Sequence, residues 1–126
     1  MTSEDIIYLA TPYSHPDPQV MEQRYRDAVQ ITAGLTNCGY VVFSPIVHSH
    51  PLATNHKMAT DWKFWERIDR VFLKKSSWMI VAMMDGWDRS RGVKAEIEIA
   101  KELNIPIKYM EVYGDEKLSA NCGLIG

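Results

Sequence analysis

The chain has 126 residues, of which 46% are hydrophobic and 24% are charged, so we expect a globular protein with one core. A net charge of −2 gives no basic footprint for binding a nucleic-acid polymer or an anionic membrane. No apolar run approaches the roughly 20 residues that span a bilayer, which excludes a membrane-spanning helix.

The termini and cysteines bear on location. Residues 1–5 are acidic and lead straight into an apolar run, so we expect no signal peptide. Cys38 and Cys122 lack the spacing of metal ligands and are predicted to be free thiols in a reducing compartment. A cytoplasmic location is therefore expected.

The first half of the chain begins with a strand and a helix. Residues 6–10 form a continuous apolar run, which is typical of a strand covered on both faces. A helix is predicted from Asp17-Pro18, an N-cap residue followed by proline, to about Asn37, before Gly39. Residues 40–43 are predicted to be the second strand.

Residues 46–60 show neither a helical nor a strand period and are predicted to be a long loop. A loop of this length in a small domain is usually functional, so we expect it to cover or line a substrate. It carries His48 and His50, for which contact with substrate or plain loop surface is favoured. A metal site is disfavoured, because no matching carboxylate or cysteine pair accompanies the two histidines.

The second half continues the alternation of helix and strand. Its predicted elements are a helix over 62–75 capped by Asp61, a strand over 78–83, a turn over 85–89, a helix over 90–103 and a strand over 105–110. The order of elements predicts an α/β protein with a parallel sheet and helices on both faces. Ligands in such sheets bind beyond the carboxyl ends of the strands, where the loops after the first three strands meet.

Two carboxylates lie on the apolar faces of consecutive helices. Glu96 shares its face with Val93 and Ile97, near the helix N-terminus, where the dipole favours an anion by ~0.3–1 kcal/mol. Such a carboxylate can act as a nucleophile or base, although an N-terminal helix acid at the core's edge is the alternative. Asp69 shares its face with Trp65, and its alternative is a structural salt bridge or a tether to a loop. Their occurrence on consecutive helices favours a shared site.

Other candidates lie at the same edge. Ser90, Arg91 and Gly92 open a helix after a strand and a turn, where free N–H groups and a hydroxyl can bind a phosphate, although many helices simply begin with serine. Tyr8 and Tyr13 flank the first loop and either line a pocket or pack in the core.

With these residues in place, the chain resembles the nucleoside 2-deoxyribosyltransferase-like superfamily, and most of all a small phage and bacterial branch of it. The shared elements are Ile7-Tyr8-Leu9-Ala10, Ser44-Pro45, Asp69 with Leu73, and the run over 85–96 that contains Ser-x-Gly-Val-x-x-Glu. The resemblance covers about residues 6–110, which predicts a single domain over 1–126 with a tail over 111–126. It implies a flavodoxin-like three-layer α/β/α fold with a four- to five-stranded parallel sheet. We expect no metal or cofactor.

The resemblance also implies residue roles. Glu96 would attack C1′ of a nucleoside or nucleotide, Asp69 would contact or protonate the base, and Tyr8 would orient Glu96. Free-nucleoside transferases resemble Asp-x-Gly-Thr-x-x-Glu here, whereas hydrolases of nucleoside 5′-monophosphates share the serine, which for this chain is Ser90. Substrate contacts are further predicted for Gly92, Tyr13, Ser44, His48 and Arg91.

The predicted function is cleavage of an N-glycosidic bond through a covalent glycosyl-enzyme, with hydrolysis favoured. The alternatives are a base-exchanging 2-deoxyribosyltransferase and a nucleotide-binding or sensing module without catalysis. The expected partners are a small nucleoside or nucleotide and further copies of this chain in a homodimer or higher homo-oligomer, because a missing fifth strand leaves a sheet edge exposed. The aromatic helix over 62–72 is a candidate for that contact.

Overall fold

The computed structural model describes residues 4–112, so the part of the predicted tail from residue 113 onward lies outside the described residues. Four parallel strands form one sheet in the order β2-β1-β3-β4. Their bounds are Ile6–Ala10 for β1, Val41–Phe43 for β2, Trp78–Met83 for β3 and Ile107–Glu111 for β4. The predicted parallel sheet is confirmed, and β1 and β3 are its central pair.

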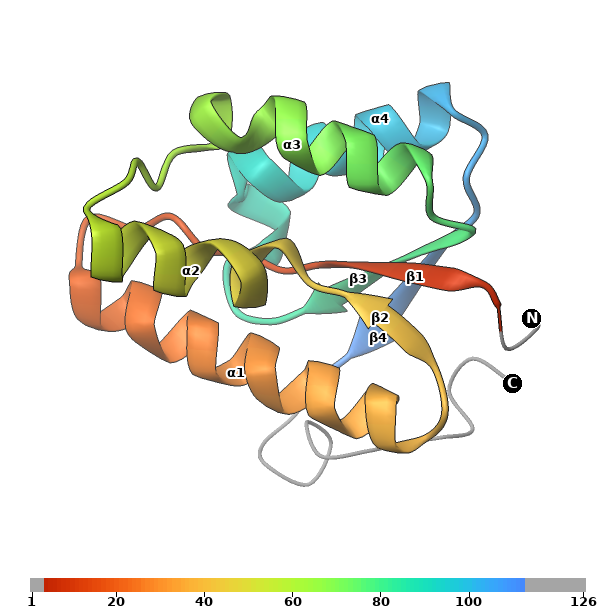
Figure 1. Cartoon of the computed structure of the whole chain (residues 1–126), viewed down its shortest axis with the longest axis horizontal. Coiled ribbons are helices and arrows are strands. Elements are labelled where there is room, and N and C mark those ends of the chain that lie inside the picture. The colour runs from red at the N-terminus through yellow and green to blue at the C-terminus, as the bar shows by residue number, and fades with distance from the viewer. Residues whose placement is uncertain (1–3, 113–126) are drawn as a thin grey trace.

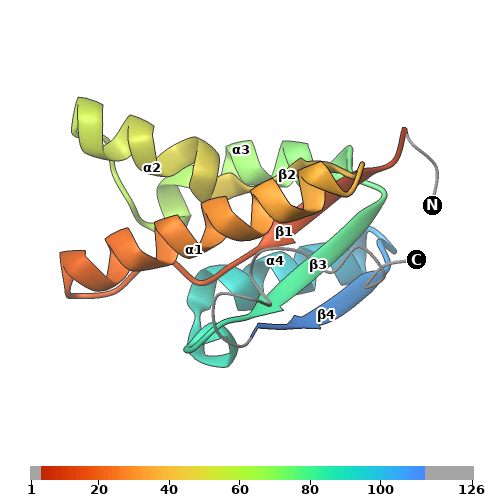
Figure 2. The ribbon, with the colours of Figure 1, turned by 90° about the horizontal axis from the view of Figure 1, so that it is seen from below.

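Helices cover both faces of this sheet, as a flavodoxin-like α/β/α arrangement requires. In Figures 1 and 2, α1 (Pro18–Asn37) covers one face, while α3 (Trp62–Lys74) and α4 (Arg91–Glu102) cover the other. The helix α2 (Pro45–His56) lies beside α1 and extends past the carboxyl end of the sheet. A short 3-10 helix, η1 (Trp87–Arg89), precedes α4.

The alternation of side chains along β1 builds two core layers. Ile7 and Leu9 point to the α1 face, whereas Tyr8 and Ala10 point to the face covered by α3 and α4. All four are fully buried, and burial of one large apolar side chain stabilises a fold by about 1.5–3 kcal/mol. Tyr8 also brings a hydroxyl into this interior, and a buried hydroxyl requires a hydrogen-bond partner.

The prediction of a long loop over 46–60 is wrong, because most of this segment is the helix α2. Its start resembles that of α1: the Ser44 side chain accepts a hydrogen bond from Val47 N–H at 3.2 Å, and proline follows. Pro51 inside the helix and the lack of a clear apolar stripe concealed it in the sequence. The helix ends at His56, and the φ of 53° at the following residue, Lys57, lies in the left-handed region.

Cys38 is disulfide-bonded, so the prediction that it is a free thiol is wrong. The argument for a reducing compartment loses this support, and a cytoplasmic location stays a prediction. Among residues 4–112, no helix is both long and apolar enough to cross a membrane.

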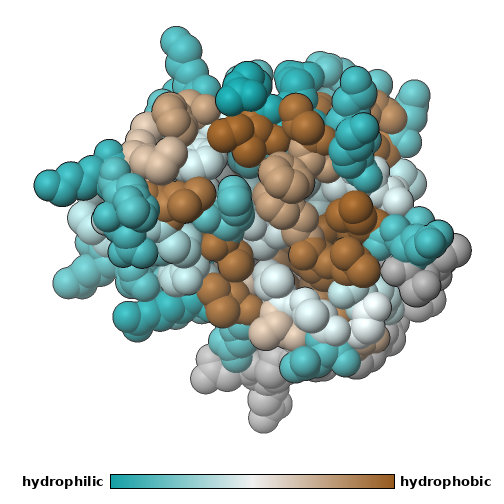
Figure 3. All heavy atoms as spheres, in the orientation of Figure 1, coloured by the Kyte–Doolittle hydropathy of each residue, from teal (hydrophilic) through white to brown (hydrophobic). Residues whose placement is uncertain are grey.

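Apolar side chains are exposed on α3. Phe64, Val71 and Phe72 are 47%, 53% and 40% exposed, and the Phe72 ring stacks on Phe43 of β2 with 3.9 Å between centroids. Figure 3 shows apolar surface gathered on the face of the molecule that carries α2, α3 and β2. The homo-oligomer stays a prediction, and this surface includes the aromatic helix expected to form its contact.

Candidate active site

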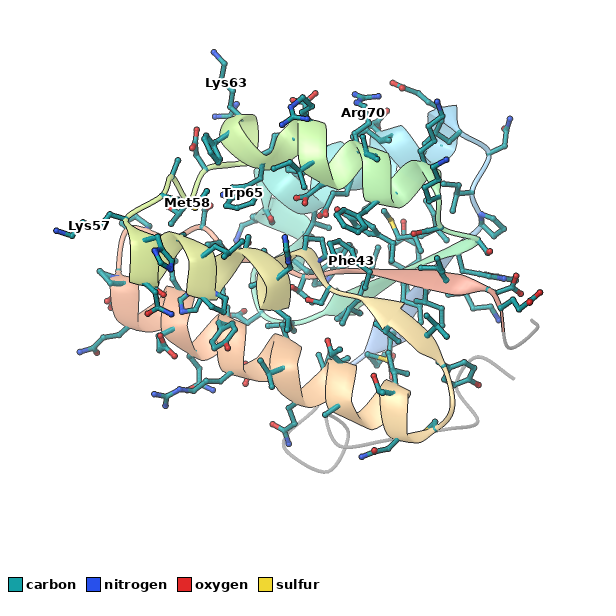
Figure 4. All side chains as sticks on the ribbon, in the orientation of Figure 1. Phe43, Lys57, Met58, Lys63, Trp65 and Arg70 are labelled. Carbon is teal, nitrogen blue, oxygen red and sulfur yellow. The ribbon has the colours of Figure 1, made fainter. Side chains whose placement is uncertain are left out.

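A cavity of about 460 Å³ lies at the carboxyl edge of the sheet. This volume is typical of small-molecule pockets in proteins. The strand order reverses between β1 and β3, and this switch point is where doubly wound sheets bind ligands. The loop after β1, the helices α2 and α3, and the first turns of α4 all contribute to its wall. In Figure 4, Trp65 points from α3 toward α2 across this region, while Lys63 points away into solvent.

Glu96 lies in this cavity wall, on the buried face of α4. Its side chain is only 5% exposed, and the Tyr8 hydroxyl donates a hydrogen bond to Glu96 Oε2. Burial raises the pKa of Glu96 to about 8, although the hydrogen bond from Tyr8 opposes the rise by favouring the carboxylate. Burial, followed by the charge of Glu96, also raises the pKa of Tyr8 well above 10, so Tyr8 keeps its proton and acts as a donor.

Asp69 lies in the same cavity wall, on α3. It is 5% exposed, and no residue of the described chain forms a hydrogen bond with its Oδ1 atom. The alternative of a structural salt bridge is not found among residues 4–112. Burial raises the pKa of Asp69 to about 7. The structure therefore brings the two predicted carboxyl groups to one cavity, and the pKa of each lies close to neutral pH.

Both carboxyl groups titrate close to neutral pH, and the charge of Asp69 contributes to the raised pKa of Glu96. With pKa values of about 7 for Asp69 and about 8 for Glu96, one group ionises while the other stays protonated. Either group can hold the remaining proton, because the two pKa values are close.

The start of α4 forms the cationic side of the cavity. Ser90 is the N-cap, and its Oγ accepts a hydrogen bond from Val93 N–H at 3.2 Å, which leaves its own O–H free to donate into the cavity. Arg89 and Arg91 line the same wall, although Arg89 also pairs with Asp88 at 3.8 Å. Gly92 also lines the cavity, and a Cβ there would meet the side chains of Ser90 and Trp62 at 3.9 and 4.0 Å, which is ordinary van der Waals contact.

Tyr13 lines the cavity and is held by a chain of hydrogen bonds that the sequence did not reveal. Its hydroxyl lies 2.6 Å from Nδ1 of the buried His50, and Nε2 of His50 lies 3.0 Å from the Glu22 carboxylate. The His50 ring also stacks on Tyr25 at 4.2 Å. The hydrogen bond from His50 lowers the pKa of Glu22. An ionised Glu22 can only accept, so Nε2 of His50 donates to it, and in the neutral imidazole Nδ1 accepts from the Tyr13 hydroxyl.

Replacing His50 by phenylalanine is expected to destabilise the protein by about 1–3 kcal/mol, because the ring volume is kept while the Tyr13 hydroxyl loses its buried partner. Urea unfolding measures the effect. His56→Phe is the matched control, since His56 is exposed at the end of the same helix. Equal unfolding midpoints for the two variants would contradict the assigned hydrogen bonds.

Arg24 of α1 links the loop after β1 to the loop after β3 at the carboxyl edge of the sheet. Its guanidinium donates to the carbonyl oxygen of Ser14 at 3.0 Å and lies 3.5 Å from that of Asp85. Gly86 follows with a φ of 87°, and a Cβ there would lie 2.6 Å from Arg24 Nη2. The backbone conformation favours glycine here, whereas the end of the flexible Arg24 side chain could shift to make room for a Cβ.

Two predicted substrate contacts lie away from the cavity wall. Ser44 is buried and caps α2, and His48 is exposed, with its ring near those of Phe43, Trp65 and Phe72. Neither is among the residues that line the cavity. Within residues 4–112, no group of three or more histidine, cysteine or acidic side chains is arranged to hold a metal ion.

Comparisons with known proteins agree with this fold. The family described as "Domain of unknown function (DUF1937)" matches residues 5–112. The solved structure of a 2-deoxyribosyltransferase from Bacillus psychrosaccharolyticus is similar, with a TM-score of 0.56 and 21% identity over 86% of this chain and 74% of that one. This likeness confirms the predicted resemblance at the level of the fold. No curated protein sequence matches the chain.

Proposed function

Because this chain belongs to the DUF1937 family, whose name assigns no activity, we propose its function from the site: cleavage of the N-glycosidic bond of a nucleoside 5′-monophosphate, with water as the final acceptor. One observation carries the proposal. Glu96, with Tyr8 hydrogen-bonded to it, and Asp69 are buried carboxyl groups in one cavity. A nucleophile and a proton donor are the two groups that this reaction requires.

The reaction proceeds as a double displacement with retention at C1′. The Glu96 carboxylate attacks C1′ through an oxocarbenium-like transition state while the bond from C1′ to the base nitrogen breaks. The bonding electron pair leaves with the base, and Asp69 protonates that nitrogen. In the second step, the Asp69 carboxylate takes a proton from water, the water oxygen bonds to C1′, and Glu96 leaves as a carboxylate.

The phosphate of the substrate is assigned to the start of α4. There the Ser90 O–H, the N–H groups at the helix N-terminus and the charges of Arg89 and Arg91 favour an anion. A carboxylate at this position would repel a phosphate.

Replacing Ser90 by aspartate is accordingly expected to reduce kcat/KM for a nucleoside 5′-monophosphate by about 10- to 100-fold, while the value for the free nucleoside changes much less. Aspartate is a good N-cap, so α4 keeps its start. The measurement is the ratio of the two kcat/KM values. Ser90→Thr is the control, because it keeps the hydroxyl and the cap, and a ratio unchanged by aspartate would place the phosphate elsewhere.

Base exchange by a 2-deoxyribosyltransferase is the second candidate, because the similar solved structure is described as an enzyme of this kind. The first half of the reaction is the same, and a second base replaces water as the acceptor. Nucleosides and their 5′-monophosphates, in ribo and deoxyribo forms, are incubated with and without an acceptor base. Free base without acceptor supports hydrolysis, a new nucleoside supports exchange, and binding without either product supports a non-catalytic module.

A further inference from the structure

Thr11, the first residue after β1, has a buried hydroxyl that the fold itself does not use. The residue is 4% exposed and lines the cavity, and no hydrogen-bond partner for its Oγ1 exists within residues 4–112. A buried hydroxyl without a partner destabilises a folded protein, whereas valine has nearly the same shape without that penalty. The fold alone therefore gives no reason for threonine at this position.

The position of Thr11 relates it to the reacting groups. Within residues 4–112, only two buried side-chain atoms lack a partner, namely Thr11 Oγ1 and Asp69 Oδ1, and both residues line one cavity. Thr11 follows Tyr8 by three residues at the carboxyl end of the same strand, and Tyr8 contacts Glu96. Two unpartnered polar atoms in one cavity indicate a ligand with polar groups that reach both of them.

We propose that Thr11 is a substrate-binding residue whose hydroxyl forms a hydrogen bond with an uncharged polar group of the substrate near the scissile bond. This inference rests on the proposed function for the identity of the substrate. A hydroxyl both donates and accepts, so its partner is a sugar hydroxyl or a polar edge of the base. The phosphate is assigned to the cationic wall at the start of α4.

The test is Thr11→Val, for which stability and binding should change in opposite directions. The unliganded variant is expected to unfold at the same temperature as the wild type or a higher one. Its Kd for the best-bound nucleoside 5′-monophosphate, measured by calorimetry, is expected to rise about three- to tenfold, as for loss of one neutral hydrogen bond. Thr11→Ser restores the hydroxyl and should restore most of the affinity.

Thr32→Val is the matched control. The Thr32 hydroxyl donates to the Ala28 carbonyl oxygen at 2.7 Å on α1, and Thr32 is not among the cavity-lining residues. This variant should leave the Kd unchanged. An unchanged Kd in Thr11→Val would overturn the proposal. A lower unfolding temperature together with that unchanged Kd would give Thr11 a structural role instead.

Equilibrium binding separates this proposal from the proposed function. If the wild type binds nucleotides without releasing base, the hydrolase proposal fails, and the Kd ratio still decides the role of Thr11. If no nucleoside or nucleotide binds, both proposals are overturned. Comparing ribo- with 2′-deoxyribonucleotides and different bases identifies the group: the Thr11→Val penalty vanishes for the ligand that lacks the partner of the hydroxyl.

Discussion

Replacing Glu96 by glutamine is expected to abolish the release of free base, by about 10⁴-fold or more, and at the same time to stabilise the protein at pH 8. The amide is not a nucleophile at C1′, so the covalent step is lost. The shape and burial of the side chain stay nearly the same, which keeps the fold intact. Release of base is followed chromatographically with a nucleoside 5′-monophosphate as substrate.

The stability effect follows from the raised pKa of Glu96. Between its ordinary value of 4.5 and the value of about 8 in the folded protein, the folded state binds a proton that the unfolded chain has lost. This contribution is fully present below pH 4.5 and is lost as pH rises through 8, at about 1.4 kcal/mol per pH unit. Glutamine does not titrate, so the free energy of unfolding of the variant does not fall in this way as the pH rises.

Urea unfolding at pH 4.5 and pH 8 measures the difference. The variant should be similar to the wild type at the lower pH and clearly more stable at the higher one. Glu98→Gln is the control, because Glu98 is on the exposed side of the same helix. A Glu96→Gln variant that is less stable at pH 8, or that releases base at the wild-type rate, would contradict the assignment.

Replacing Asp69 by asparagine is expected to reduce kcat for ordinary nucleotides by about 10²- to 10⁴-fold, because the leaving base is no longer protonated. A nucleotide of 7-methylguanine provides an internal control. Its base is already cationic and departs without a proton, so this substrate should lose much less activity in the variant. Equal losses for the two substrates would exclude Asp69 as the proton donor.

The pH dependence of kcat/KM also tests the assignment of Asp69 as the proton donor. In the wild type, kcat/KM should rise as the pair loses its first proton and fall as it loses its last, within a narrow range around pH 7 to 8. Asparagine at position 69 removes the falling limb, since no proton remains to be lost there. A falling limb that persists in Asp69→Asn would assign the acid to another residue.

The central features of the fold and the site were predictable from local patterns. The apolar runs indicated the parallel strands, and the helical period placed Glu96 and Asp69 on buried faces, where the structure has them. The pairing of Tyr8 with Glu96 came from the resemblance, because no periodicity relates residues 88 positions apart.

Other features depend on contacts that a sequence pattern does not encode. The helix α2 lacks a distinct apolar stripe and contains Pro51, so its pattern resembled a loop. The link from Glu22 through His50 to Tyr13 joins α1, α2 and the first loop, and it appears once these elements pack together. Thr11 is distinguished by a buried hydroxyl without a partner, which is a property of the assembled fold.

The most direct test of the central claim is mass spectrometry of the protein mixed with a nucleoside 5′-monophosphate that carries fluorine at C2′. The electronegative fluorine destabilises the oxocarbenium-like transition states, and a glycosyl-enzyme that is hydrolysed slowly therefore accumulates. The account predicts a mass increase equal to the sugar phosphate, located on the peptide that contains Glu96 and absent from Glu96→Gln. An adduct on another residue, or complete turnover of this nucleotide with the protein unmodified throughout, would contradict it.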